Sequence, residues 1–207
     1  MNLKPFKVIV FDLGDVIINI DFNNTYNAFA KLSGLSLEAT LGKFEELQVF
    51  DRYEKGSIKD EEFLIYMQEQ FAPSSSLTQV LDAWNAILMD IPVERIEQIK
   101  ELRKQYPVYI LSNTSNLHII GVNKILYDST GIKNLNQICD KPFYSYEMGL
   151  RKPSIEIYHH LLKEINCEPS DVLFLDDNKD NVLSAQTIGI QVVLVTKQNT
   201  MLDILRF

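Results

Sequence analysis

The sequence predicts an α/β fold: a doubly wound parallel sheet, covered by helices on both faces and carrying an inserted α-helical segment. Two observations support this fold class. Short strand-like segments alternate with helical patterns along most of the chain, and one long interval contains helical patterns alone. With 207 residues, of which 46% are hydrophobic, the chain is long enough to bury one substantial core.

The strand-like segments are short runs rich in β-branched and aromatic residues. They lie at residues 7–11, 108–111, 172–175 and 191–195, with a weaker one at 137–144. Helical patterns fill the intervals, such as 92–106, which begins with a proline, and 153–165, which begins with Pro-Ser. Gly189 is expected to end the helix before the last strand. This alternation predicts parallel strands with helices on both faces of the sheet.

Residues 17–88 interrupt the alternation. They contain no convincing strand pattern and instead have the pattern of several amphipathic helices, including 36–56 and 57–71, with a Ser-rich break at 73–76. Because this interval follows the first strand, it should stand over the carboxyl edge of the sheet, where a lid over a site belongs. We therefore expect a core domain of residues 1–16 and 89–207 and a helical cap domain of residues 17–88.

Charge and composition narrow the range of partners. The net charge of −8 and the pI near 4.9 argue against nucleic acid as a partner. No apolar stretch is long enough to span a bilayer, and the N-terminal residues lead directly into the first strand pattern, so we expect a cytoplasmic protein without a membrane partner. We expect a monomer or weak homodimer. Cys139 and Cys167 lack metal-ligand spacing and are expected to be reduced packing residues.

Polar residues stand at four strand ends or helix starts: Asp12, the pair Ser112-Asn113, Lys152, and the pair Asp176-Asp177. The carboxyl ends of parallel strands lie on one edge of a sheet, so these groups should converge in space. Carboxylates are ligands for a hard cation such as Mg²⁺, and a lysine with small polar groups can hold a phosphate. The set therefore predicts a phosphate site with a cation beside it.

Each residue taken alone has a simpler interpretation. Asp12 is equally suited to a turn, Lys152 to a solvated surface, and Asp176-Asp177 to the cap of the helix that follows. Adjacent carboxylates repel each other, however, and are less favourable without a cation. The functional interpretation rests on the combination, in this order and at these element ends.

Four stretches carry a resemblance to a known family: "FDLGDVIINIDF", "LSNTSNLH", "YSYEMGLRKPSIEIY" and "FLDDNKDNV". They resemble the four motifs of the haloacid dehalogenase superfamily, in particular its bacterial sugar-phosphatase branch with a helical cap. The resemblance implies a Rossmann-like core and a Mg²⁺-dependent phosphomonoester hydrolase. It also implies a small phosphorylated metabolite, such as a sugar phosphate, as the substrate.

The resemblance also implies roles for these residues. Asp12 would be the nucleophile that forms an aspartyl-phosphate, and Lys152 would neutralise the phosphate and orient Asp12. The Ser112 hydroxyl and the backbone amide of Asn113 would bind the phosphoryl oxygens. Mg²⁺ would be held by the Asp12 carboxylate, the Gly14 carbonyl and the Asp177 carboxylate, with Asp176 beside it.

One residue departs from the family pattern. Most phosphatases of this superfamily have a second aspartate two residues after the nucleophile, where it protonates the leaving alcohol; here that residue is Gly14. Asp15 follows and is a candidate substitute acid. The departure leaves open a catalytically weak protein that binds or senses a phospho-ligand. A 2-haloacid dehalogenase is a further alternative, although its chemistry would leave Asp176-Asp177 without a cation to bind.

Substrate specificity is expected to lie in the cap. Arg52, Trp84 and Asn85 could contact the substrate, because aromatic faces and polar tips suit a sugar. Surface or core packing is the commoner role for such residues. His118 follows Ser112 by six residues and could line the pocket, although a position on a helix surface is the simpler expectation for it.

Overall fold

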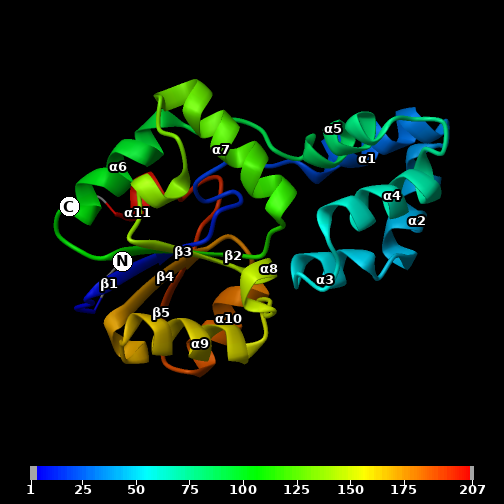
Figure 1. Cartoon of the computed structure of the whole chain (residues 1–207). Helices are drawn as coiled ribbons and strands as arrows, with labels where there is room; N and C mark the ends of the chain where they lie inside the picture. The colour runs from blue at the N-terminus through cyan, green and yellow to red at the C-terminus, as the bar shows by residue number, and fades with distance from the viewer. Residues whose placement is uncertain (1–3, 206–207) are drawn as a thin grey trace.

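The computed structural model describes residues 4–205 and is built on a five-stranded parallel sheet (Figure 1). The strands stand in the order β3-β2-β1-β4-β5. Their bounds are β1 (Val8–Phe11), β2 (Val108–Ser112), β3 (Lys141–Tyr144), β4 (Val172–Asp176) and β5 (Gln191–Leu194). All five predicted strands form, and the weak segment at 137–144 is a strand only over its last four residues because a 3-10 helix, η1 (Leu135–Gln137), precedes it. The predicted α/β class with a parallel sheet is confirmed.

Strand β1 is the centre of the sheet and its register aligns the strand ends. All four of its residues are buried, and its last residue, Phe11, pairs with Ile110 of β2 and with Leu175 of β4. The residues that follow these positions therefore reach the same edge. This alignment brings Asp12, Ser112 and Asp176 together although they lie far apart in sequence.

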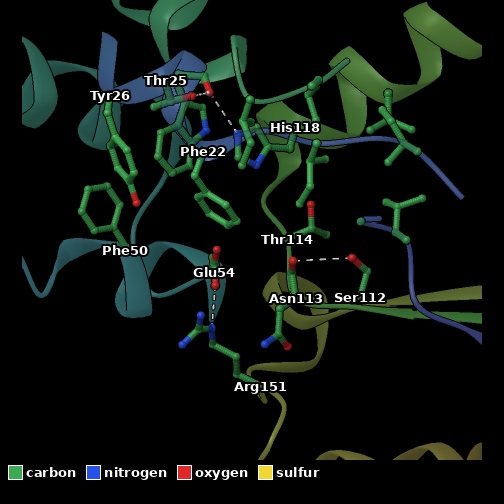
Figure 2. A pocket seen from close by; sticks show the side chains of 18 of the residues that line it. Phe22, Thr25, Tyr26, Phe50, Glu54, Ser112, Asn113, Thr114, His118 and Arg151 are labelled. Carbon is green, nitrogen blue, oxygen red and sulfur yellow. Dashed lines mark hydrogen bonds and ion pairs between the residues drawn. The ribbon is translucent and has the colours of Figure 1, made fainter. Parts of the chain in front are cut away.

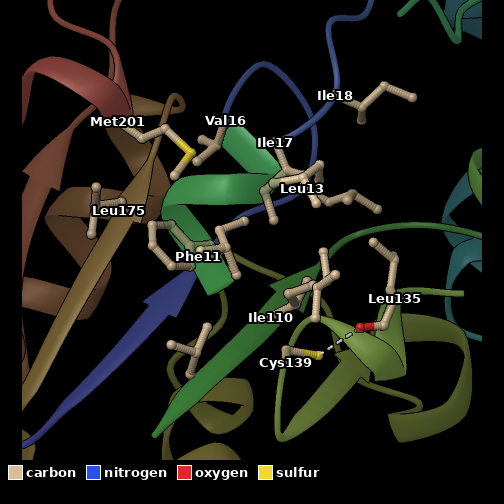
Figure 3. Packing of buried hydrophobic residues seen from close by; sticks show 14 of the residues in the cluster. Phe11, Leu13, Val16, Ile17, Ile18, Ile110, Leu135, Cys139, Leu175 and Met201 are labelled. Carbon is tan, nitrogen blue, oxygen red and sulfur yellow. Dashed lines mark hydrogen bonds between the residues drawn. The ribbon is translucent and has the colours of Figure 1, made fainter. Parts of the chain in front are cut away.

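Helices cover both faces of the sheet. Figure 1 shows α6 (Val93–Arg103), α7 (Asn116–Thr130) and α11 (Met201–Ile204) on one face, and α9 (Ile155–Ile165) and α10 (Lys179–Thr187) on the other. The short helices α8 (Ser145–Met148) and η2 (Pro169–Asp171) complete the core. The pleat of β1 divides its side chains between two apolar clusters: Ile9 and Phe11 face α6 and α7, whereas Val8 and Val10 face α9. Figure 3 shows the first cluster, in which Phe11, Ile110 and Leu175 pack beneath the loop that follows β1.

The interval between β1 and α6 contains five helices that we call the cap. They are α1 (Phe22–Ser33), α2 (Leu37–Glu46), α3 (Val49–Glu54), α4 (Asp60–Phe71) and α5 (Leu77–Asn85), and they project to one side of the sheet (Figure 1). The cap has its own aromatic cluster, which includes Phe29, Phe63 and Trp84. Within the described residues, Leu117 of α7 is the one buried member of this cluster that lies outside the cap.

The predicted helix over 36–56 is interrupted. Leu47 is extended, with φ −86° and ψ 116°, and separates α2 from α3. The interruption turns the chain so that Phe44 and Phe50 stack with ring centroids 5.2 Å apart and planes 4° apart. Packing across the bend explains why a continuous amphipathic pattern forms two helices.

Two antiparallel chain segments join the cap to the core. Ile20 bridges to Leu88, and backbone hydrogen bonds run from Asp21 N to Ile87 O at 2.9 Å and from Met89 N to Asn19 O at 3.0 Å. The cap touches the core again at Gly56, whose φ is +66°. A Cβ at that position would lie 2.1 Å from the carbonyl oxygen of Tyr146. At this point the two backbones are too close for any side chain.

Both cysteines are free, as predicted: Cys139 is buried against Leu135 (Figure 3) and Cys167 is half-buried. Within residues 4–205, none of the helices combines the length and the apolar composition needed to cross a membrane.

Candidate active site

Lys152 is the centre of the polar cluster at the carboxyl edge of the sheet. Its Nζ donates to Asp12 Oδ1 at 2.6 Å, to Asp176 Oδ2 at 2.7 Å and to the carbonyl of Leu111 at 2.8 Å. An ammonium group has three donors, and all three are used. The Lys152 side chain is 1% exposed and that of Asp176 is not exposed at all, so these are buried ion pairs. The predicted convergence of the first, third and fourth motifs is present.

Asp176 is fixed by further hydrogen bonds. Its Oδ1 accepts from the backbone N–H of Asn178 at 2.8 Å, and the Asn181 amide donates to both carboxylate oxygens at 3.0 and 3.1 Å. Asp176 therefore holds Lys152 in place and has little capacity left for another ligand. The sequence analysis did not identify Asn181; its place in the first turn of α10, facing the end of β4, was the available signal.

Asn113 joins the second motif to the third. Its Oδ1 accepts from the backbone N–H of Lys152 at 2.8 Å, and its Nδ2 donates to the Lys152 carbonyl, also at 2.8 Å. Ser145, which the sequence analysis also missed, holds the segment after β2. Its hydroxyl accepts from Thr114 N at 2.9 Å and donates to Thr114 O at 3.1 Å. The Asn113 side chain thus holds the loop that carries Lys152. Only the backbone N–H of Asn113 is left for the predicted phosphate contact.

The carboxylates of Asp12, Asp176 and Asp177 offer oxygen atoms that all lie within 4.8 Å of one another. Burial, together with the nearby Asp176, raises the pKa of Asp12 to about 7, although Lys152 opposes the shift. Burial and the neighbouring carboxylates of Asp176 and Asp15 raise the pKa of Asp177 to about 6. Because Asp176 is bound to Lys152 and Asn181, Asp12 and Asp177 are the two crowded carboxylates whose repulsion a cation would relieve. Hard oxygen ligands of this kind fit Mg²⁺.

A cavity of about 270 Å³ lies between the core and the cap. Ser112, Asn113 and Thr114 line it from the end of β2, as Figure 2 shows, and Gly14 lines it from the loop after β1. Cap side chains, among them Phe22 and Phe50, line the opposite part (Figure 2). The cavity thus extends from the polar residues at the sheet edge into an aromatic cap.

Neither Gly14 nor Asp15 places an acid in this cavity. A Cβ on Gly14 would lie 2.9 Å from Ile20 Cδ1, so Ile20 fills the space that a side chain at residue 14 would need. Asp15 has φ +50°, and its Oδ1 accepts from the backbone N–H of Ile20 at 3.1 Å. It lines a separate hollow beside Asp177 and Arg95, not the cavity below the cap. Its role as substitute acid stays a prediction.

The three candidate substrate contacts in the cap fall in three different places. Trp84 lines the cavity, and its ring stacks on Phe50 with centroids 5.6 Å apart. Its Nε1 is buried and has no hydrogen-bond partner in the described part of the chain. Asn85 lies beside Trp84 but does not line the cavity, and its buried Oδ1 also has no partner within residues 4–205. Arg52 is exposed and lies outside the cavity lining.

The sequence analysis expected His118 on the helix surface, but it does not lie there. It lines the cavity, stacks on Trp84 with centroids 4.5 Å apart and planes 7° apart, and its Nε2 lies 3.3 Å from the Trp84 carbonyl. Burial lowers its pKa to about 4. The expectation was wrong because α7 turns its first residues toward the cap, which is remote in sequence. His118 is therefore a neutral ring that donates to a backbone carbonyl.

Arg151 and Glu54 form an ion pair between core and cap that the sequence analysis did not assign. Arg151 Nε donates to Glu54 Oε2 at 2.5 Å (Figure 2), and Nη1 lies 3.7 Å from Asp51 Oδ1. Burial raises the pKa of Glu54 against the opposing effect of Arg151. Both residues line the cavity, so the pair closes one side of it.

Known proteins are similar to this chain in sequence and in fold. The chain is 31% identical over 185 residues to a D-ribitol-5-phosphate phosphatase of Bacteroides thetaiotaomicron, with 89% of each chain covered. It is 26% identical over 187 residues to a sesquiterpene phosphatase of Aspergillus oryzae, with 89% of this chain and 87% of the relative covered.

A solved structure has the same architecture over almost the whole chain. It is a HAD family enzyme of Bacteroides thetaiotaomicron in complex with magnesium and inorganic phosphate. The two structures superpose with a TM-score of 0.89 and 30% sequence identity, over 97% of this chain and 100% of the other. The family described as haloacid dehalogenase-like hydrolase matches residues 6–189, which include all four motifs. The chain therefore belongs to the haloacid dehalogenase-like hydrolase family.

Proposed function

We propose that this protein is a Mg²⁺-dependent phosphomonoester hydrolase that acts on a small phosphorylated metabolite through an aspartyl-phosphate on Asp12. The observation that supports this most directly is the buried Asp12–Lys152–Asp176 arrangement beside Asp177, next to a cavity that Ser112 enters. Relatives named as phosphatases, and a similar structure that contains magnesium and phosphate, agree with it.

Lys152 orients the nucleophile. It holds Oδ1 of Asp12 at 2.6 Å, and no hydrogen bond within residues 4–205 holds Oδ2, which leaves that oxygen for attack on phosphorus. The Ser112 hydroxyl and the backbone N–H of Asn113 would receive the phosphoryl oxygens. Pre-set donors of this kind stabilise the charge that develops in phosphoryl transfer without having to reorganise.

Asp12 and Asp177, with the backbone carbonyl of Gly14, are the residues that would hold Mg²⁺. The bound cation would offset the repulsion between the Asp12 carboxylate and the phosphate dianion. Asp176 would act on the other side of the nucleophile, by fixing Lys152.

The reaction has two balanced steps. Asp12 Oδ2 forms a bond to phosphorus while the ester oxygen leaves with the electrons of the broken bond and takes a proton from solvent. Water then attacks the phosphorus of the aspartyl-phosphate and loses a proton to solvent, while the bond between Asp12 Oδ2 and phosphorus breaks to give back the carboxylate and release inorganic phosphate. Gly14 has no acid to protonate the departing oxygen, so esters of more acidic alcohols should react faster. Anomeric sugar phosphates are such esters, and the sugar-alcohol phosphate named for the Bacteroides relative is a second substrate to test.

The test is hydrolysis of p-nitrophenyl phosphate with and without Mg²⁺, by the wild type and by Asp12→Asn. We expect turnover that requires Mg²⁺ and is lost in the variant, while Asp21→Asn, at the half-buried N-cap of α1, remains active. Turnover that persists in Asp12→Asn would contradict the proposal.

One observation favours a second candidate. Gly14 stands where most phosphatases of the family have an acid, and Ile20 occupies the space beside it. A protein that only binds a phospho-ligand would have the same arrangement of residues. In that case the wild type would be inert toward aryl phosphates, yet would bind inorganic phosphate in a calorimetric titration that Ser112→Ala weakens.

A further inference from the structure

We propose that the organic group of the substrate is apolar and about the size of one ring or a short branched chain, and that the cavity disfavours polyols. This inference rests on the proposed function, since it concerns the group that the phosphate carries. It departs from the sugar phosphate that the sequence analysis favoured.

The first argument is the surface that the substrate would touch. Beyond Ser112 and Thr114, the cavity wall is formed mainly by apolar side chains from the cap and from the two segments that join it to the core. They include Ile20, Phe22, Phe44, Phe50, Ile87 and Leu88. Figure 2 shows the rings of Phe22 and Phe50 directed into the same space. Such a wall stabilises a ligand by removing apolar surface from water.

The second argument is that most of the polar side chains in this half of the cavity already have protein partners, although the Trp84 Nε1 and the Tyr26 hydroxyl have no hydrogen-bond partner within residues 4–205. Thr25 donates its hydroxyl to the Trp84 carbonyl at 3.2 Å, and the His118 ring nitrogen lies 3.3 Å from the same oxygen (Figure 2). Glu54 and Arg151 are paired with each other. A polyol buried here would exchange hydrogen bonds to water for few bonds to protein, which is unfavourable for every hydroxyl left without a partner.

The third argument is size. A cavity of about 150 Å³ lined by apolar side chains is enough to bind benzene. The cavity here, at about 270 Å³, has room for one ring and the atoms that link it to phosphate.

The experiment compares two esters of primary alcohols, so that the leaving groups are chemically similar: cyclohexylmethyl phosphate and ribitol 5-phosphate. With Mg²⁺ present, we expect kcat/KM to be at least about tenfold higher for the cyclohexylmethyl ester. Phe22→Ser should reduce this preference and Phe22→Leu should keep most of it. Phe22 is 56% exposed, so neither change threatens the fold. Tyr127→Ser, which removes a 55% exposed ring outside the cavity lining, is the matched control and should leave the preference unchanged.

A binding measurement separates this inference from the proposed function. Calorimetry on Asp12→Asn, which lacks the proposed nucleophile, with cyclohexylmethylphosphonate and with ribitol 5-phosphate reports the preference without turnover. Failure to hydrolyse p-nitrophenyl phosphate would contradict the proposed function, while tighter binding of the phosphonate would still support the apolar subsite. Equal or tighter binding of ribitol 5-phosphate, or an equal or higher kcat/KM for it, would overturn the inference.

Discussion

At the scale of single residues, the site depends on one buried cation balanced by two carboxylates. Lys152 lies between Asp12 and Asp176, and burial alone would lower its pKa, but the two carboxylates raise it above the ordinary value for lysine. The ammonium group therefore stays charged inside the protein. Because neither carboxylate has another cation among the described residues, the three side chains form one electrostatic unit.

Removing the charge of Lys152 should destabilise the fold. In Lys152→Met, Asp176 would remain buried with an uncompensated charge, and we expect a loss of about 3–5 kcal/mol in the free energy of unfolding. Chemical denaturation measures it. The matched control is Lys141→Met, which removes a lysine whose partner, Glu164, is exposed and whose loss should matter far less. Similar losses in the two variants would contradict the argument.

The raised pKa values of Asp12 and Asp177 predict how stability depends on pH and Mg²⁺. An unfolded aspartate titrates near ~3.9, whereas these two titrate at about 7 and about 6 in the folded protein without metal. The folded state thus binds protons more tightly, and the stability contributed by these groups decreases as the pH rises from about 4 to about 7.

Mg²⁺ competes with those protons and should reverse the loss. We expect Mg²⁺ to raise Tm more at pH 8 than at pH 5, because both carboxylates are ionised at the higher pH. Thermal unfolding at constant ionic strength measures the effect. Asp177→Asn should reduce the Mg²⁺ effect at pH 8. An equal rise in Tm at both pH values would exclude Asp12 and Asp177 as the ligands.

At the scale of elements, the strands were predictable from sequence and the contacts of the cap were not. Strands β1, β2 and β4 are short apolar runs with a polar residue at the end of the strand or directly after it, which is a local pattern. Their parallel direction follows from the alternation with helices. The convergence of Asp12 and Lys152 followed from that geometry, and their direct contact is what the family resemblance implied. The positions of His118 and Arg151 did not, because each depends on a cap helix that no local pattern places against the core.

The ion pair of Arg151 with Glu54 should hold the cap closed over the cavity. We expect the closed cap to retain the bound ligand, so Arg151→Met, which removes an interaction of the closed arrangement, should raise KM about fivefold, equivalent to about 1 kcal/mol. The value is small because the Arg151 side chain is 38% exposed and solvent screens the pair. Steady-state kinetics measures it. Lys55→Met, which breaks a pair with Asp51 inside the cap, is the control. A lower kcat with unchanged KM would argue against a latch.

At the scale of the whole molecule, the sheet and the cap are stabilised by separate apolar clusters. Phe174 packs in the cluster beneath the sheet and Phe63 in the cluster of the cap, and both are almost completely buried. We propose that residues 17–88 form a cap domain that opens as a unit. The residues that would bind Mg²⁺ lie outside it.

A substitution that leaves a cavity in one of these two clusters should therefore loosen only the part of the molecule that the cluster stabilises. Phe63→Ala and Phe174→Ala should each lose about 3–5 kcal/mol, but only Phe63→Ala should accelerate amide exchange mainly in α1–α5 and leave Mg²⁺ binding intact. Hydrogen exchange followed by mass spectrometry and a Mg²⁺ titration distinguish the two. Faster exchange throughout the sheet in Phe63→Ala would show that the two parts unfold together.

The backbone contact between Gly56 and Tyr146 makes residue 56 a stop that limits how far the cap can swing toward the core. A single added methyl group there would act as a wedge, in a backbone conformation that already disfavours any side chain. Gly56→Ala would thus bias the cap toward an open arrangement without altering a charged group or a group proposed to contact the substrate. A change at residue 56 would therefore alter how far the cap closes and leave the chemistry of the pocket as it is.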